Sequence, residues 1–154
     1  MKRESNLSIR CSKMKLILIM ILSCILLSCF SNTNDDDIQR SRIMDRLQRV
    51  QEAFNQANWD TIMNYYHPNF YHNGQNYYTQ RLIWREMTAF YNRISIDIIN
   101  IDVNEDYAIA RFVLYYYDMN NQYGPYIEPE HRGDISYFYY DRGEWWVYGN
   151  QKRE

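Results

Sequence analysis

The chain has 154 residues, of which 46% are hydrophobic and 23% are charged. This balance is ordinary for a globular protein and excludes global disorder, and the length fits one domain with an N-terminal extension. All three cysteines lie before residue 30, so the later residues form no internal disulfide and no cysteine metal site. Residues 1–28 hold five of the 17 basic and one of the 19 acidic side chains, which leaves residues 29–154 with a net charge near −6. A net negative charge of this size excludes the strongly basic character that is typical of nucleic-acid-binding domains.

An apolar run of 15 residues, Leu16–Phe30, follows Lys15 near the start of the chain. The run is shorter than the ~20 residues that a transmembrane helix needs, and with the basic residue before it the run has the proportions of a secretory signal peptide. We therefore predict a signal peptide over residues 1–28, with Met14 as an alternative start of the chain. An uncleaved membrane anchor is the alternative interpretation of the same run.

The end of this run, Leu26-Leu27-Ser28-Cys29, resembles the lipobox of bacterial lipoproteins, where the cysteine becomes the lipidated first residue of the mature chain. The resemblance implies that Cys29 carries palmitate and anchors the protein to a membrane of the bacterial cell envelope, on the periplasmic or surface side. Cys24 fits the same pattern but would leave an apolar N-terminus. Residues 31–37 are polar, and residues 29–37 are expected to form a flexible tether. Because they include no polybasic patch, membrane attachment must come from the lipid.

Three helices are predicted after the tether. Over residues 36–57 apolar side chains recur at spacings of three and four, the period of an amphipathic helix. These side chains are Ile43, Leu47, Val50, Phe54 and Ala57. A short helix is predicted over residues 61–66 and a third over residues 79–92, with Thr79 as its cap. Asn73-Gly74 indicates a small hairpin between these two helices.

Strands are predicted in the second half of the chain. From Ile94 the apolar residues alternate, and the phase of the alternation changes at Ile98-Ile99, which predicts a bulge and a bend. A turn at residues 104–106 leads into a long strand over Tyr107–Asp118. The polar stretch Met119–Arg132 is expected to be a loop that covers a pocket mouth or a sheet edge, because it is long and holds one glycine and two prolines.

Two aromatic runs within Asp134–Gln151 flank Asp141-Arg142-Gly143, which predicts a β-hairpin. We expect a three-residue loop with Gly143 in the left-handed position, and in that register Tyr139 lies opposite Trp145. One face of the hairpin is then formed by Ile135, Tyr137, Tyr139, Trp145 and Val147. The other face is formed by Ser136, Phe138, Tyr140, Trp146 and Tyr148.

Several short stretches, in this order and spacing, resemble the nuclear-transport-factor-2-like (NTF2-like) superfamily, which includes ketosteroid isomerases and SnoaL-like polyketide cyclases. They are Ala57–Asp60 followed by Tyr65–Phe70, Glu105–Ala110 and Arg142–Val147. The resemblance implies an α+β fold for residues 38–154, in which three N-terminal helices pack on a curved, mainly antiparallel sheet to form a cone. It also implies a pocket on the concave side of the sheet and a dimer interface on its outer face.

The same resemblance assigns a role to each face of the hairpin. Trp145 should face the helices, with Tyr137 and Tyr139 beside it. Because side chains alternate along a strand, Tyr115 and Tyr117 should lie together on one face of theirs, opposite their neighbours in the sequence. The residues expected to bind a small apolar or amphipathic ligand are Tyr71, Tyr115, Tyr117, Tyr137, Tyr139 and Trp145. The residues expected to form a homodimer interface are Phe138, Trp146 and Tyr148. Aromatic packing without any ligand is the alternative for these tyrosines.

Catalysis has few candidate residues. The isomerases need a carboxylate base and a donor tyrosine, whereas the base position falls on Asn73 and residues 36–57 contain no tyrosine. His72, His67 and His131 remain as candidates for a general base, and their spacing resembles no metal-ligand motif. We therefore predict a lipid-anchored module that binds a small molecule or a protein, without enzymatic activity and without a cofactor. The alternative is a small dehydratase-like or cyclase-like pocket enzyme that uses His72 or His67.

Overall fold

The computed structural model describes residues 35–152. The signal peptide, Met14 and Cys29 lie outside the described residues, as does most of the expected tether, so these expectations stay predictions. From Gln39 onward the described residues form one compact unit. Within residues 35–152, no helix has the length and apolar character that a membrane span requires.

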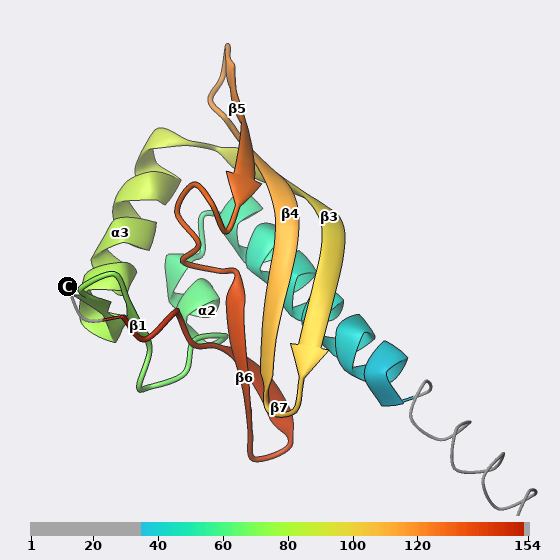
Figure 1. The fold of residues 1–154 in the computed structure, drawn as a ribbon. Coiled ribbons are helices and arrows are strands. Elements are labelled where there is room, and N and C mark those ends of the chain that lie inside the picture. Colours follow the sequence, from blue (N-terminus) through green and yellow to red (C-terminus); the bar gives the residue numbers. More distant parts are fainter. Residues whose placement is uncertain (1–34, 153–154) are drawn as a thin grey trace, which may run out of the picture. The chain divides into compact units, whose positions relative to one another are not determined.

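Three helices precede the sheet in the described part of the chain. They are a helix over residues 35–55 (cyan in Figure 1), α2 at Trp59–Met63 and α3 at Tyr77–Phe90. The side chains of Asn58 and Asn76 cap α2 and α3, because they accept hydrogen bonds from the backbone N–H groups of Thr61 and Thr79 at 3.1 Å and 3.0 Å. Both helices begin two residues earlier than predicted, since these asparagines supply the caps.

A small hairpin separates α2 from α3, and a five-stranded antiparallel sheet follows α3. The hairpin consists of β1 (Tyr71–His72) and β2 (Gln75–Asn76). The strands of the sheet are β3 (Arg93–Asn104), β4 (Tyr107–Tyr117), β5 (Gln122–Glu128), β6 (Tyr137–Asp141) and β7 (Glu144–Val147). β4 is central: β3 pairs along one side of it, β6 and β5 share its other side, and β7 pairs with β6.

The stretch Met119–Arg132 is not a plain loop as predicted, because it contains the strand β5. Phe112 pairs with Glu128, and Tyr117 pairs with Gln122. Pro125 is tolerated in β5 because an edge strand has one side without ladder hydrogen bonds. The bulge predicted in β3 is confirmed, since the register shifts between Ile98 and Asn100.

Side chains of the first helix cover the free edge of β3. Asn55 accepts a hydrogen bond from the backbone N–H of Ile94 at 2.7 Å and donates one to its carbonyl at 3.3 Å, while Gln51 accepts from the N–H of Ile96 at 2.7 Å. An uncovered edge is a template for pairing with another chain. These contacts therefore satisfy part of that edge and hold the helix against the sheet.

The core lies between the inner face of the sheet and the helices, and Figure 1 shows the first helix crossing behind β3 and β4. Every second residue of β4 is buried, in the series Ala108, Ala110, Phe112, Leu114 and Tyr116. The predicted helical stripe meets this face through Ile43, Leu47, Val50 and Phe54, all of which are buried. Ala57 is exposed, because the helix ends at residue 55.

The hairpin of β6 and β7 differs from its predicted register by one residue. Arg142 (φ 52°) and Gly143 (φ 87°) form a two-residue loop with both residues in the left-handed region, a connection that suits the twist of the flanking strands. Tyr139 therefore pairs with Trp146 instead of Trp145. Because side chains alternate along a strand, this shift of one residue moves each β6 side chain to the opposite face of the hairpin relative to the β7 side chains.

This exchange corrects several expected roles. Phe138 is 1% exposed and lies in the core with Trp145, so it is not on the outer face as predicted. Tyr137 and Tyr139 lie on the opposite face from Trp145, and Tyr139 stacks on Tyr148 with ring centroids 4.9 Å apart. The concave lining expected from Tyr137 and Tyr139 is therefore absent from this hairpin.

Candidate functional site

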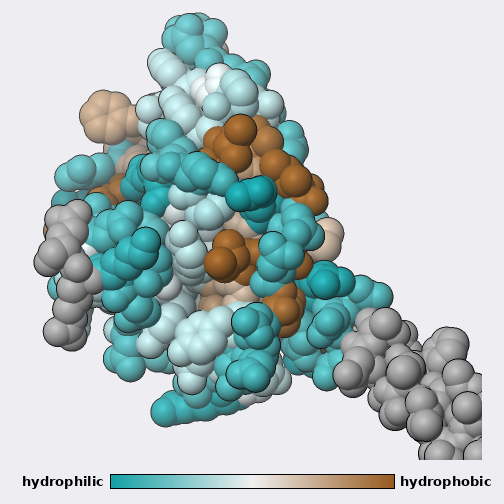
Figure 2. Space-filling view, in the orientation of Figure 1, coloured by the Kyte–Doolittle hydropathy of each residue, from teal (hydrophilic) through white to brown (hydrophobic). Residues whose placement is uncertain are grey.

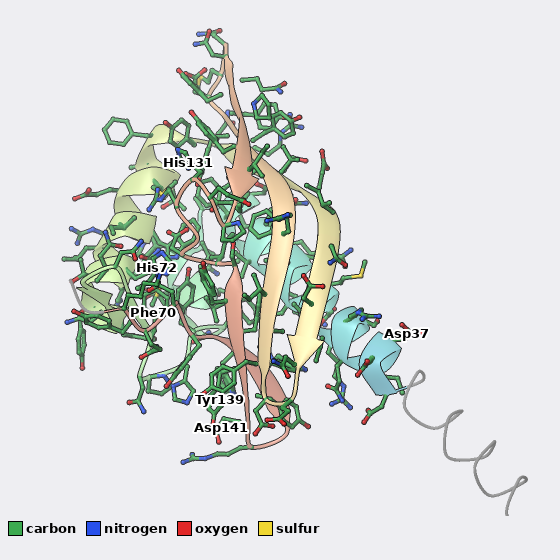
Figure 3. All side chains as sticks on the ribbon, viewed as in Figure 1. Asp37, Phe70, His72, His131, Tyr139 and Asp141 are labelled. Carbon is green, nitrogen blue, oxygen red and sulfur yellow. The ribbon has the colours of Figure 1, made fainter. Side chains whose placement is uncertain are left out.

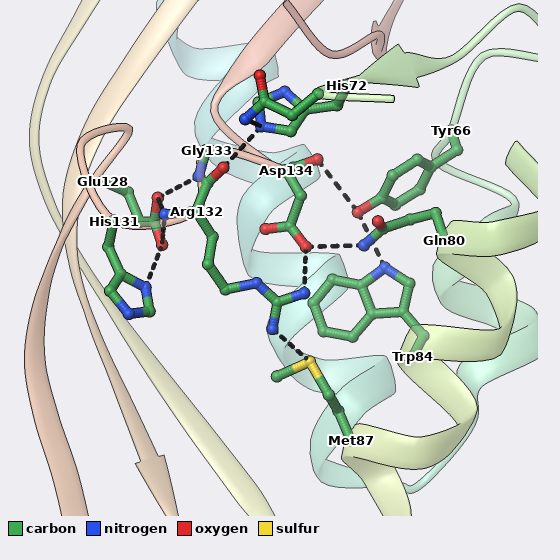
Figure 4. A network of polar contacts seen from close by, with 11 residues as sticks. Tyr66, His72, Gln80, Trp84, Met87, Glu128, His131, Arg132, Gly133 and Asp134 are labelled. Atoms are coloured by element: carbon green, nitrogen blue, oxygen red, sulfur yellow. Dashed lines mark hydrogen bonds and ion pairs between the residues drawn. The ribbon is translucent and has the colours of Figure 1, made fainter. Parts of the chain in front are cut away.

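A buried polar network fills the space between α3 and the sheet (Figure 4). The carboxylate of Asp134, a residue that is 3% exposed, accepts a hydrogen bond from Gln80 Nε2 at 2.7 Å and faces Arg132 Nη2 at 3.1 Å. The other guanidinium nitrogen, Arg132 Nη1, contacts the sulfur of Met87 at 3.0 Å. A buried carboxylate of this kind is tolerated only when it is paired and hydrogen-bonded.

Tyr66 and Trp84 extend this network into the core. Trp84 Nε1 donates to Tyr66 Oη at 2.9 Å, and the Tyr66 hydroxyl donates to the backbone carbonyl of Asp134 at 3.4 Å. Burial, followed by the charge of Asp134, raises the pKa of Tyr66 well above its ordinary value, so the hydroxyl stays protonated. These two large side chains are buried in the core of the domain.

Glu128 is a second buried acid, at the end of β5. It is fully buried, accepts hydrogen bonds from the backbone N–H groups of Arg132 and Gly133, and lies 3.5 Å from His131 Nδ1. Burial raises the pKa of Glu128, although the hydrogen bonds from Gly133 and Arg132 oppose that change. In the folded state this acid therefore holds its proton more tightly than in the unfolded chain.

The unfolding free energy of Glu128→Gln minus that of the native chain is expected to increase as the pH rises from 4 to 7. An acid whose pKa is raised by folding makes stability fall with pH, starting near its unfolded pKa of about 4.5 and ending above its folded pKa. Glutamine keeps one oxygen for the two backbone donors but carries no charge. Urea unfolding at several pH values would measure the difference between the two proteins. A difference that stays constant with pH would contradict the assignment.

His72, the first candidate base, is buried and engaged at both ring nitrogens. The backbone N–H of Asn150 donates to His72 Nδ1 at 3.2 Å, and His72 Nε2 lies 2.6 Å from the carbonyl oxygen of Arg132. Because a backbone N–H can only donate, Nδ1 is the acceptor and the ring proton is assigned to Nε2, which donates to Arg132. His72 thus ties β1 to the loop before β6 and to the C-terminal segment.

His67, the second candidate, lies beneath the outer aromatic side chains of the hairpin. Its Nδ1 accepts a hydrogen bond from the backbone N–H of Asn69 at 3.0 Å, and its Nε2 lies 3.5 Å from Asp141 Oδ2. The ring centroids of Tyr148 and Trp146 are 5.2 Å and 6.3 Å from that of His67. His67 is therefore held in place by a backbone donor, an acid and aromatic rings.

A surface cavity of about 720 Å³ opens beside His67, between the end of α2 and the turn of the β6–β7 hairpin. It is lined by Met63, Asn64, Tyr66, His67, Pro68, Asn69, Tyr77, Tyr78, Asp141, Arg142 and Trp146. A cavity of this size, with aromatic walls and a few polar groups, has the character of a small-molecule site. Figure 3 shows Asp141 and Tyr139 at the same end of the sheet.

The residues predicted to bind a ligand do not meet in one place. Tyr115 and Tyr117 lie on the outer face of β4. There the guanidinium carbon of Arg93 lies over the Tyr117 ring, 4.0 Å from its centroid. Trp145 is buried in the core, and Tyr71 pairs through its backbone with Tyr148. Sequence reasoning missed Asp141 as a site residue, because a turn position signals only a change of chain direction.

His131, the third candidate, is an exposed residue whose ring stacks on Tyr126 with centroids 4.3 Å apart. Among residues 35–152, no group of three or more histidine, cysteine or acidic side chains is placed to hold a metal ion.

No family model matches the sequence, and no curated protein matches it either. Among solved structures, the chain is similar to an NTF2-like protein of unknown function from Shewanella oneidensis (13% identity, TM-score 0.56, covering 71% of this chain and 94% of that one). It is also similar to a protein of unknown function from Mycobacterium tuberculosis (14% identity, TM-score 0.58, covering 77% and 73%). A third similar structure is named as a candidate scytalone dehydratase, from Novosphingobium aromaticivorans (12% identity, TM-score 0.57, covering 76% and 84%). The described domain therefore has the NTF2-like α+β fold, with helices N-terminal to a curved antiparallel sheet.

Proposed function

We propose that the protein is a lipid-anchored protein of the bacterial cell envelope, whose NTF2-like domain binds a small molecule or a partner protein without catalysing a reaction. The anchor rests on the resemblance of Leu26–Cys29 to a lipobox. The binding role rests on the site, because a fold that hosts both enzymes and binding proteins does not imply an activity.

The observation that carries the binding role is the state of the two buried histidines. A general base needs a free lone pair within reach of the proton that it removes. In His72 the acceptor nitrogen is bound to the N–H of Asn150, and in His67 it is bound to the N–H of Asn69. Protonation of either acceptor nitrogen would break a hydrogen bond to the backbone, so both side chains are suited to a structural role.

One observation favours the alternative, a dehydratase-like or cyclase-like enzyme. His67 faces Asp141 at the wall of the cavity, and a histidine oriented by a carboxylate is a common catalytic arrangement. In this chain the remaining nitrogen of His67 points to the backbone of Asn69 and away from the cavity's acid. Catalysis would therefore require Asn69 to move.

Radiolabelled palmitate incorporation in a bacterial host tests the anchor. The native chain is expected to be labelled and to sediment with membranes, whereas Cys29→Ser is expected to lose the label, since the lipidated residue is gone. Cys24→Ser is the matched control and should be labelled like the native chain. Labelling that persists in Cys29→Ser, or that disappears in Cys24→Ser, would overturn the assignment of Cys29.

We also propose the homodimer, with a corrected interface. Figure 2 shows hydrophobic side chains gathered over the strands on the outer face of the sheet. Tyr107, Ile109 and Ile127 are 55%, 43% and 52% exposed there, and exposed apolar side chains on one face are typical of a partner surface. Trp146 and Tyr148 remain in this proposed surface, whereas Phe138 is excluded from it because its side chain is buried in the core.

Analytical ultracentrifugation tests the dimer. The native chain is expected to sediment as a dimer and Ile109→Glu as a monomer, because the substitution places a charge in the apolar face. Leu82→Glu, at an exposed position of α3, is the matched control and should leave the dimer intact. A native monomer, or a dimer that Ile109→Glu does not disturb, would rule out this interface.

A further inference from the structure

We propose that the cavity beside His67 and Asp141 binds a protonated amine that carries an apolar or aromatic group. This inference rests on the proposed binding function, and it specifies both the site and the chemical class of the ligand. The volume of about 720 Å³ lies in the range of sites that hold one small organic molecule.

The carboxylate of Asp141 is the first reason for this choice. It is 34% exposed, and its nearest donors among the described residues are His67 Nε2 at 3.5 Å and Arg142 Nε at 3.6 Å. Both distances exceed the 2.7–3.2 Å of ordinary N–H···O hydrogen bonds, and a carboxylate can accept about four such bonds. Asp141 therefore keeps acceptor capacity for a ligand N–H, at a position that the β6–β7 turn holds in place.

The aromatic walls are the second reason. Trp146 Nε1 donates to the backbone carbonyl of Asp141 at 3.2 Å, which fixes the indole beside the carboxylate. The Tyr77 hydroxyl donates a hydrogen bond to the backbone carbonyl of Met63 at 3.3 Å. The rings of Tyr77 and Tyr78 pack edge to face with their centroids 5.9 Å apart. The rings at the wall offer apolar surface and electron-rich faces, which attract organic cations.

The cationic groups around the cavity do not compete for this role. The side chain of Arg142 is 90% exposed at the tip of the turn, so it can rotate into solvent. Arg46, whose guanidinium lies 5.6 Å from the Trp146 ring, is paired with Glu144 at 2.8 Å. His67 accepts the backbone N–H of Asn69 at Nδ1, and its Nε2 stays 3.5 Å from Asp141 Oδ2, beyond ordinary hydrogen-bond distance. An anionic ligand would meet the charge of Asp141 without a dedicated partner.

Isothermal titration calorimetry on the full chain in a non-ionic detergent tests the proposal with two probes of similar size, 2-phenylethylamine and 3-phenylpropionate. The amine is expected to bind at least about tenfold more tightly than the carboxylate. Asp141→Asn, which removes the charge and keeps the shape, is expected to weaken amine binding about tenfold or more, as for the loss of a charge-assisted hydrogen bond. Asp97→Asn, the same change on the exposed surface of β3, should leave the affinity unchanged.

Four outcomes overturn the proposal. Equal binding of the two probes would show that charge is not recognised, and unchanged affinity in Asp141→Asn would show that the amine binds elsewhere. The comparison of probes on the native chain does not depend on whether the variant folds. Binding of 3-phenylpropionate alone would overturn the amine class but leave the binding function standing. If neither probe binds, and native mass spectrometry also finds no bound small molecule, the small-molecule form of the proposed function fails with it.

Discussion

Phe138→Ala is expected to destabilise the domain by about 3–5 kcal/mol, the usual cost of truncating a buried phenylalanine. The ring is 1% exposed and lies on the strand face that also buries Trp145 and Val147. Its removal takes apolar surface from the core and leaves a cavity that the neighbouring strands can close only in part. Urea unfolding followed by tryptophan fluorescence would measure the loss of free energy.

Tyr139→Ala is the matched control, one residue further along β6. The ring of Tyr139 packs on Tyr107 and Tyr148, both with centroids 4.9 Å away, and such pairs contribute about 0.5–1.5 kcal/mol each. We therefore expect Tyr139→Ala to cost less than Phe138→Ala. The reverse order would support the register predicted from the sequence and contradict the two-residue turn.

Asp134→Ala is expected to be the second severe substitution, at about 3–5 kcal/mol, because it leaves the charge of Arg132 without its acid. The Asp134 carboxylate is nearly inaccessible to solvent and also receives the amide of Gln80. The cost arises mainly from the unpaired guanidinium, so the double variant Asp134→Ala/Arg132→Met should recover much of the lost stability. Chemical unfolding of the three proteins gives the required double-mutant comparison.

The exposed ion pair of Asp60 and Arg81, at 2.9 Å, provides the control for this experiment. Both side chains are largely in solvent, where such a pair contributes about 0–1 kcal/mol, so Asp60→Ala should change stability little. If Asp134→Ala costs no more than Asp60→Ala, the buried network does not hold α3 against the sheet. If the double variant is no more stable than Asp134→Ala, the unpaired charge is not the source of the loss.

Much of the fold could be predicted from local patterns in the sequence. The stripe of Ile43, Leu47, Val50 and Phe54 predicted a helix face that is buried as expected. The change of phase at Ile98-Ile99 predicted the bulge that the β3–β4 pairing contains. In both cases the periodicity of burial is encoded in neighbouring residues, so no knowledge of distant contacts is needed.

The sequence was less informative about β5 and the C-terminal hairpin. β5 was predicted as part of a loop because it contains Gly124 and Pro125. The cost of a proline in a strand depends on whether the strand lies at an edge, which the sequence does not show. In the hairpin, both strands are aromatic on both faces, so hydrophobic alternation could not select between a two-residue and a three-residue turn. The expected ligand-binding and interface residues followed that choice, which explains why Phe138 and Tyr139 were assigned to the wrong faces.

Composition, periodicity and short motifs were enough to predict the class of fold, the helices and most strands, and they are also the basis of the proposed leader with a lipid site at Cys29. The register of the β6–β7 hairpin, the hydrogen bonds of His67 and His72 to the backbone, and the cavity beside Asp141 became known from the three-dimensional structure. Two of the contacts that build the site join residues about 70 to 80 positions apart in the chain, namely those of His67 with Asp141 and of His72 with Asn150. Their geometry follows from strand pairing and packing, which no local pattern in the sequence records.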